Sequence, residues 1–328
     1  MNETKQDRPS ISEIYAQGEE NLKKMGVEWK YPGGKKGPAV LANRRYLDCL
    51  FFEPKFFEPV EVDTTCTLFG TKLKAPVFCS AISRRPFMSE ESMAEIAKGV
   101  FDAGSLIILG IGGSSELQKA IDTGAPVVKM VKPYRNMEQV YKKVRDAENR
   151  GCVAVGMDID HAYGLLLDGK VSKTKLFGPQ STAELKEVIS ECKLPFVFKG
   201  ILSVSDAKAA AQLGASAVIV SNHGSGAFDF TVPSMIALPK IVETVGKTLT
   251  VLVDTGFETG NDVFKALGFG AKAVGFASPV VLAYAARSSE GVELLINEIT
   301  ADLRRTMAAT GCSNLAHIAG TTIIQVPS

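Results

Sequence analysis

The sequence predicts a parallel (β/α)8 barrel with an N-terminal helical and loop extension. Eight short apolar runs recur along the 328 residues, and segments with apolar residues at helical spacing separate them. A doubly wound open sheet is the main alternative, but it would not ordinarily use eight such regular units. The predicted strands are Pro76–Ala81, Ser105–Leu109, Pro126–Val131, Cys152–Asp158, Pro195–Gly200, Ala217–Ser221, Thr250–Asp254 and Ala273–Phe276.

Helical segments lie between these runs, and several follow a polar residue that is able to cap a helix. A short hairpin is expected earlier, from Asp63 to Gly70. The predicted helices include Ser89–Ala103, Met137–Arg150, Ser181–Ser190, Ser205–Leu213, Ser234–Val245 and Gly260–Leu267.

The first forty residues differ from this regular pattern. Apolar residues between Ile11 and Met25 fit one amphipathic helix, capped at Ser10 or Ser12 and ended by Gly26. The stretch 31–38 is rich in glycine, proline and lysine, which is typical of a solvated loop. We therefore expect residues 1–40 to form an extension and residues 41–328 to form one barrel domain.

Composition excludes several classes of protein. The 37 basic and 36 acidic residues nearly cancel, so charge gives no reason to expect binding to nucleic acid or to an anionic membrane. The six cysteines include no CxxC pair, which favours reduced thiols over a disulfide framework or a zinc site. No apolar stretch has the length of a signal peptide core or a membrane span. We expect a cytoplasmic protein without a metal site.

Polar residues follow the predicted strands, and His223 is the most distinctive of them. It comes directly after the apolar run Val218–Val220. The carboxyl ends of barrel strands meet at one mouth, where barrel enzymes place their chemistry. A general base needs a carboxylate to orient it, and Asp160 is available, but a hydrogen-bonded structural histidine is an equal alternative. The residues expected at the mouth are Lys129, Val131, Asp158, Asp160, Lys199, His223, Asp254 and the turn Gly275–Ser278.

Lys199 ends the apolar strand Phe196–Phe198, so its ammonium group either faces the mouth or extends to solvent. Several segments near the ends of the later predicted strands occur in an order and spacing typical of a known family. They are Val197–Ile201, Ile219–Gly224, and Val253–Gly256 followed by Gly260–Leu267. With the tail Thr306–Cys312, they resemble the FMN-dependent 2-hydroxy acid oxidase and dehydrogenase family, which includes glycolate and lactate oxidases. The resemblance covers roughly residues 40 to 325.

The resemblance implies a barrel with FMN across its mouth and a small-molecule substrate. His223 would remove a substrate proton while a hydride equivalent passes to the flavin, and Asp160 would orient His223. Lys199 would stabilise the anionic reduced flavin ring. A homo-oligomer, in particular a tetramer, is also implied. The residues implied in cofactor binding are Lys129, Asp158, Lys199, Ser221, Gly224, Asp254, Gly256 and Gly275.

The chain departs from the family at both ends of the site. Gly226 occupies the position of an arginine that would bind a substrate carboxylate, and the segment His161–Leu167 lacks a second one. Val131 replaces a tyrosine. At the phosphate end, Glu258 and Ser278 replace arginines. Lys129 and Asp158 replace neutral polar residues, and they are candidates to pair with each other across the mouth.

Other charged or glycine-rich loops offer substitutes for the missing cations. We interpret the basic residues among them mainly as solvated loop charge. The turn Gly110–Ser114 offers backbone amides to a phosphate, although a glycine pattern alone is weak support. The basic candidates are Arg84, Arg85, Lys132, Arg135 and Lys272.

Three functions remain open from the sequence. The first is an FMN-dependent oxidoreductase acting on a small hydroxylated substrate. The second is a barrel that has lost the flavin and acts as a ligand-binding or assembly subunit. The third keeps the acid–base pair for isomerase or lyase chemistry. The retention of His223, Asp160, Lys199 and Asp254 together favours the first.

Overall fold

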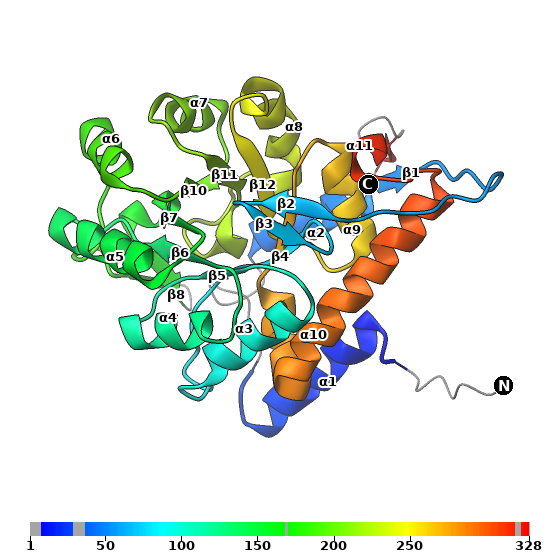
Figure 1. Cartoon of the computed structure of the whole chain (residues 1–328), viewed down its shortest axis with the longest axis horizontal. Coiled ribbons are helices and arrows are strands. Elements are labelled where there is room, and N and C mark those ends of the chain that lie inside the picture. Colours follow the sequence, from blue (N-terminus) through cyan, green and yellow to red (C-terminus); the bar gives the residue numbers. More distant parts are fainter. Residues whose placement is uncertain (1–7, 29–36, 168–169, 319–322, 328) are drawn as a thin grey trace.

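The computed structural model describes residues 8–28, 37–167, 170–318 and 323–327 and contains the predicted barrel (Figure 1). Eight parallel strands close in the order β10-β11-β12-β13-β4-β5-β6-β7. Each strand agrees with its predicted run to within two residues at either end. The strands are β4 (Val77–Ile82), β5 (Ile107–Leu109), β6 (Val127–Val131), β7 (Ala154–Asp158), β10 (Phe196–Ile201), β11 (Ala217–Val220), β12 (Thr250–Asp254) and β13 (Val274–Phe276).

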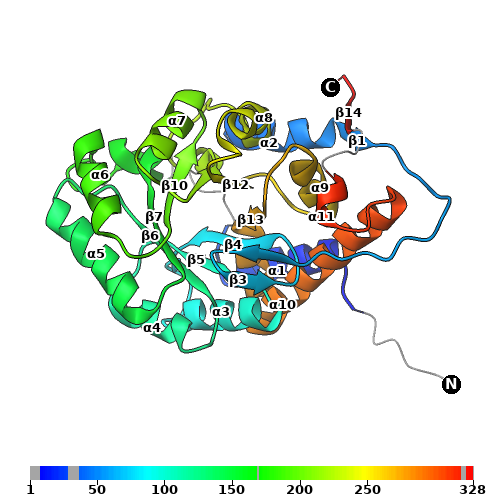
Figure 2. The ribbon, with the colours of Figure 1, turned by 45° about the horizontal axis from the view of Figure 1, so that its top comes forward.

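A helix follows each barrel strand, and together these helices form the outer layer (Figure 2). Ser181 and Thr259 begin two of them with reciprocal capping boxes, as their polar side chains allow. None of the described helices is long and apolar enough to cross a membrane. The outer helices are α3 (Ser92–Asp102), α4 (Ser114–Ile121), α5 (Met137–Arg150), α6 (Thr182–Glu191), α7 (Val204–Gln212), α8 (Ser234–Val245), α9 (Gly260–Gly268) and α10 (Ser278–Ala309).

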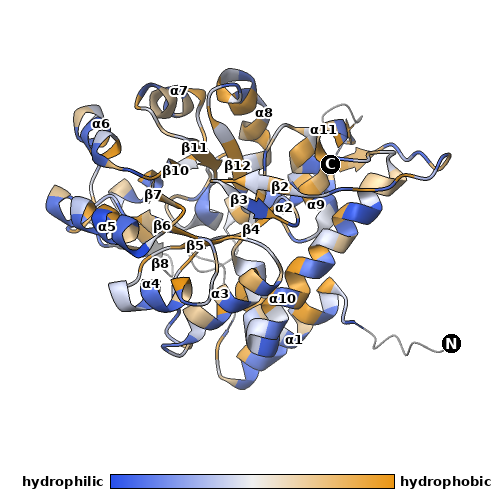
Figure 3. Ribbon diagram, viewed as in Figure 1, coloured by the Kyte–Doolittle hydropathy of each residue, from blue (hydrophilic) through white to orange (hydrophobic). Residues whose placement is uncertain are grey.

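Side chains alternate along each strand between the barrel interior and the layer under the helices. On β6, Val128 and Met130 belong to the interior cluster, whereas Val127 and Val131 belong to the outer cluster. In Figure 3 the barrel strands are mainly apolar, whereas helix α5, for example, is largely hydrophilic. This alternation decides which residues at the strand ends face the mouth.

The N-terminal part packs against the barrel. Helix α1 (Ile11–Lys24) lies along α10, as Figure 1 shows. Gly18 makes this close approach possible, because a Cβ atom there would lie 2.2 Å from the carbonyl oxygen of Leu282. The Tyr15 hydroxyl donates to the Glu258 carbonyl at 2.8 Å. The extension is therefore joined to a loop of the barrel mouth.

Several elements were not predicted. Helix α2 (Pro38–Asp48) spans the expected domain boundary at residue 40. The expected hairpin consists of β2 and β3, and its second strand lies just beyond Gly70. Residues 31–36 of the expected lysine-rich loop lie outside the described residues. The remaining small elements are the pairs β1 (Leu50–Phe52) with β14 (Ile323–Gln325), β2 (Cys66–Leu68) with β3 (Thr71–Leu73), β8 (Leu165–Leu167) with β9 (Lys170–Ser172), and helix α11 (Leu315–Ile318).

Candidate active site

A cavity of about 410 Å³ opens at the carboxyl ends of the barrel strands. Glycines and polar side chains from different strands meet there, as expected for a barrel mouth. Asp158, Asp160 and Ser221 lie behind this lining and contact it through hydrogen bonds or ion pairs. The predicted residues that line the cavity are Lys199, His223, Gly224, Asp254, Gly256 and Gly275.

His223 and Asp160 form a close pair. His223 begins a short turn after β11, and its backbone N–H donates to the Ser221 hydroxyl at 3.1 Å. The Nδ1 atom of His223 lies 2.7 Å from Oδ2 of Asp160, which comes from the turn after β7. Burial alone would raise the pKa of Asp160, but the adjacent histidines His223 and His161 lower it to about 2. An ionised carboxylate therefore orients the imidazole.

Lys199 is buried in the mouth and does not extend to solvent. Its side chain is 2% exposed. The Nζ atom lies 3.3 Å from Oδ2 of Asp254 and 3.1 Å from Nδ1 of His223, and it donates to the Ser221 hydroxyl at 3.0 Å. Burial opposes the charged form, but Asp254 and the other carboxylates nearby raise the pKa of Lys199. The site thus holds a fixed ammonium group beside the imidazole.

Lys132 and His161 extend this cluster, although neither was predicted to belong to it. Lys132 is only 6% exposed, so its interpretation as solvated loop charge is wrong. Its Nζ atom donates to Oδ2 of Asp158 at 2.6 Å and lies 2.7 Å from Nδ1 of His161. Lys132 continues the inward alternation of Val128 and Met130 on β6, and that signal was present in the sequence.

Lys129 lies elsewhere, and the expected pair between Lys129 and Asp158 is wrong. Its side chain points to the opposite face of the strand from that of Lys132. Lys129 is 5% exposed and does not line the cavity. Its ammonium group donates instead to the carbonyl of Gly110. Burial lowers the pKa of Lys129 to about 8. Val131, also expected at the mouth, packs in the outer cluster.

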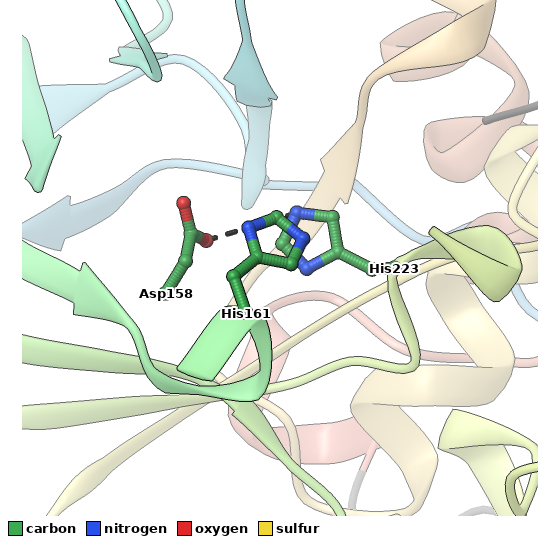
Figure 4. A group of neighbouring side chains, drawn as sticks. All are labelled: Asp158, His161 and His223. Atoms are coloured by element: carbon green, nitrogen blue, oxygen red, sulfur yellow. Dashed lines mark ion pairs between the residues drawn. The ribbon is translucent and has the colours of Figure 1, made fainter. Parts of the chain in front are cut away.

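Asp158, His161 and His223 have the spacing of a metal site, with their ligand atoms within 4.8 Å of one another (Figure 4). The Oδ1 atom of Asp158 has no hydrogen-bond partner within the described ranges and lies 3.7 Å from Nε2 of His223. However, the ammonium group of Lys132 already bonds to two of the three residues. A metal cation bound here would be repelled by the positive charge of Lys132. The three residues therefore fit an acid–base cluster better than a metal centre.

The residues that replace the expected arginines line the cavity. Gly226 lines the cavity where a carboxylate-binding side chain was expected, and Glu258 and Ser278 line it at the phosphate end. Arg44 also lines it, but its guanidinium group is engaged in a bidentate pair with Asp262.

Arg85 is the strongest substitute among the candidate cations. It lines the cavity, has no ion pair with a carboxylate in the described part of the chain, and burial lowers its pKa. Arg84, Arg135 and Lys272 are exposed, in agreement with their interpretation as loop charge. Helix α10 begins at the same cavity with no side chain capping its first N–H groups. An anionic group would find both a cation and a helix N-terminus here, so the residues present fit FMN.

The barrel, with an imidazole–carboxylate pair and buried ammonium groups at its mouth, defines a (β/α)8 enzyme with acid–base machinery. A family model described as FMN-dependent dehydrogenase matches residues 19–166 and 167–325, so the chain belongs to the FMN-dependent dehydrogenase family. It is therefore an oxidoreductase of the 2-hydroxy acid oxidase family with FMN as its cofactor.

Known relatives agree with this assignment. The chain is 26% identical to glycolate oxidase from Spinacia oleracea, with 94% of each chain covered. It is 27% identical to 4-hydroxymandelate oxidase from Amycolatopsis orientalis, covering 84% of this chain and 87% of the relative. Among solved structures, a mandelate oxidase with an arginine replaced by leucine, bound to 2-hydroxy-phenylacetamide, has a TM-score of 0.88 and 27% identity. It covers 97% of this chain and 99% of that one.

Proposed function

We propose that this protein oxidises a small hydroxylated substrate that resembles a 2-hydroxy acid but carries a neutral group in place of the carboxylate. The observation that supports the chemistry most directly is the 2.7 Å contact between His223 Nδ1 and Asp160, with the Lys199 ammonium group 3.1 Å from the same nitrogen. A base, its orienting carboxylate and a fixed positive charge therefore share one cavity.

Each residue has a role in this proposal. FMN, when bound, supplies the acceptor for the electron pair that leaves the substrate. The Nδ1–H group of His223 donates to Asp160, which at 2.7 Å is closer to Nδ1 than the Lys199 ammonium group is at 3.1 Å. The Nε2 atom, 3.3 Å from the same ammonium group, then keeps the lone pair that would accept a substrate proton. The imidazolium that results is stabilised by Asp160 and by Oδ1 of Asp158, which lies 3.7 Å from Nε2. Asp158 would thus add to the stabilisation that Asp160 supplies.

The residues that would hold FMN come from opposite sides of the mouth. Lys199 would lie beside the flavin ring, and Asp254 would accept hydrogen bonds from the ribityl hydroxyls. Gly275 and the N-terminus of α10 would face the phosphate. Arg85 would supply the missing positive charge, because it follows β4, the strand that pairs with β13 immediately before α10.

The absence of arginines supports a substrate without a carboxylate. Gly226 offers no side chain to bind one, and no arginine is present between His161 and Leu167. The mandelate oxidase relative that was solved with 2-hydroxy-phenylacetamide has itself lost an arginine, and its ligand is an amide rather than an acid. We take this as support for a 2-hydroxy carbonyl compound whose carbonyl group is uncharged.

The first experiment is the visible spectrum of the freshly purified protein, followed by titration with FMN. We expect a bound flavin spectrum. A colourless protein that does not respond to FMN would contradict the proposal, and would favour the flavin-free binding subunit or the isomerase, which the family assignment does not favour.

The second experiment tests the base. His223→Asn is expected to lower the rate of flavin reduction by a 2-hydroxy amide by about 10²–10⁴-fold, the contribution typical of a general base. FMN affinity serves as the control and is expected to change little. An unchanged reduction rate would exclude His223 as the base.

We also propose a homo-tetramer, as the family resemblance implies. Light scattering of the eluting protein tests it, and a monomeric mass would contradict it.

A further inference from the structure

The position of Lys132 fixes the protonation state of His161. Lys132 Nζ contacts Oδ2 of Asp158 at 2.6 Å and Nδ1 of His161 at 2.7 Å, and all three residues are less than a tenth exposed. An ammonium group has only donors, so Nδ1 of His161 must be the acceptor. A neutral imidazole that accepts at Nδ1 carries its hydrogen on Nε2.

His161 is also held in this neutral form by its surroundings. Burial lowers the pKa of His161 well below its usual value, and the nearby charge of Lys132 acts in the same direction. Its Nε2–H group is therefore a permanent donor that bears no positive charge. A lysine or arginine at this place would instead offer a donor with a full charge.

This donor lies next to the proposed base. The ring centroids of His161 and His223 are 4.2 Å apart and the rings are tilted by 40° (Figure 4). Both histidines line the same cavity. The Nε2 atom of His161 has no hydrogen-bond partner among residues 8–28, 37–167, 170–318 and 323–327. A ligand that reaches His223 therefore also meets an unused donor on His161.

The local charge disfavours a carboxylate at this place. Lys132 pairs with Asp158 and Lys199 pairs with Asp254, and a third carboxylate, that of Asp160, contacts His223. The buried cluster therefore holds one more carboxylate than ammonium groups. A carboxylate entering beside it would be repelled, whereas a neutral carbonyl oxygen would not.

We propose that His161 binds the substrate by donating its Nε2–H to a carbonyl oxygen next to the hydroxyl-bearing carbon, and that the carboxylates around it exclude a charged group at that place. The substrate class is then a 2-hydroxy amide or a related uncharged 2-hydroxy carbonyl compound. This inference rests on the proposed function, because it assumes that the hydroxyl-bearing carbon is oriented toward His223. His161 is a substrate-binding residue in this arrangement, and His223 keeps the role of base.

The test compares two ligands that cannot be oxidised, phenylacetamide and phenylacetate. They differ in the neutral or charged group, and neither carries a hydroxyl. Binding is measured by the change in the flavin spectrum of the FMN-loaded protein and independently by calorimetry. The native protein is expected to prefer the amide, because the carboxylates of the cluster repel phenylacetate. The hydrogen bond from His161 is expected to supply about tenfold of the affinity for phenylacetamide, which corresponds to about 1.4 kcal/mol.

Two variants separate the donor from the ring. His161→Phe keeps a flat ring against His223 but has no N–H group, and its affinity for phenylacetamide is expected to fall about tenfold. His161→Gln restores an N–H donor and is expected to retain part of that affinity. The glutamine variant also provides the measurement if the phenylalanine variant does not fold, as circular dichroism would reveal. A native preference for phenylacetate, or an affinity for phenylacetamide that is unchanged in His161→Phe, would overturn the inference.

A failure of the proposed function can be distinguished from a failure of the inference about His161. If the protein bound no FMN, the flavin reaction would be excluded. Calorimetry would still report whether His161 contributes to the affinity for phenylacetamide.

Discussion

At the scale of single residues, the direction of a side chain on its strand decides its chemistry. Lys129 and Lys132 are three positions apart on and just after β6, so they point to opposite sides of the barrel wall. Lys132 joins the mouth cluster, and Lys129 is buried under the outer helices. Position near the end of a predicted strand placed Lys129 at the mouth, whereas Lys132, next to a proline, was interpreted as solvated loop charge.

The first residue-scale prediction concerns Lys129. Its folded pKa of about 8 lies below the 10.5 of an exposed lysine, so between these pH values the unfolded chain binds more protons than the folded protein. The free energy of unfolding should therefore rise with pH from about 8 to 10.5. Below this window the burial cost is fully present, and Lys129→Met is expected to stabilise the protein at pH 7 by up to about 3 kcal/mol.

Urea unfolding at a series of pH values measures both effects. Lys142→Met, which removes an exposed lysine from α5, is the matched control and is expected to change neither the stability nor the slope appreciably. If Lys129→Met kept the same rise with pH as the native protein, the buried ammonium group would not be its source.

The second residue-scale prediction concerns Arg85. Arg85→Gln is expected to weaken FMN binding about tenfold to a hundredfold, because a hydrogen bond to a charged group contributes about 1.5–3 kcal/mol. Riboflavin, which has no phosphate, should bind the variant as well as it binds the native protein. Arg84→Gln is the control, since Arg84 is exposed and lies 3.7 Å from Glu116. Equal losses for FMN and riboflavin would place Arg85 away from the phosphate.

At the scale of elements, the sequence predicted those that apolar periodicity defines. The eight barrel strands are short runs buried on both faces, and such runs are recognisable without a partner. Helix α2 was missed because it buries only Ala39, Asn43 and Leu47, and because it follows a stretch typical of loops. The pair β1 and β14 depends on strands far apart in the chain, which no local pattern reports.

The packing of α1 on α10 gives the element-scale prediction. A side chain at Gly18 would collide with the backbone at Leu282, so Gly18→Val is expected to separate the two helices locally and to destabilise the protein by about 1–3 kcal/mol. Ala16→Val places the same side chain at an exposed position of α1 and controls for helix propensity. Thermal unfolding measures the difference, and equal losses in both variants would exclude the helix contact as the cause.

At the scale of the whole molecule, buried carboxylates connect the layers. Asp262 of α9 binds Arg44 of α2, and Asp158 binds Lys132 inside the mouth. Burial would raise the pKa of each carboxylate, but the cations lower both below the ordinary value. The sequence predicted the barrel and the pair of His223 with Asp160. It did not predict these ion pairs, because the two partners of each pair come from different strands or helices. Only the closed barrel brings those elements together.

The whole-molecule prediction follows from these pairs. A carboxylate whose pKa is lower in the folded protein adds stability above its unfolded pKa of about 3.8 and loses it as pH falls further. The free energy of unfolding should therefore decrease as pH falls below about 4. Denaturant unfolding between pH 3 and 6 measures it, with Glu290→Gln as an exposed control that should leave the slope unchanged. A flat profile would contradict the contribution of the buried pairs.

The pairing of β1 with β14 has a consequence for synthesis of the chain. Leu50–Phe52 hydrogen-bonds with Ile323–Gln325, and β4 closes the barrel only against β13. On the ribosome, Phe52 must wait for the 271 residues up to Ile323, and Val77 for the 197 residues up to Val274, before their partners have been translated. Until then the edge of β4 that pairs with β13 is unpaired, and an unpaired apolar strand edge of this kind favours aggregation of the nascent chain.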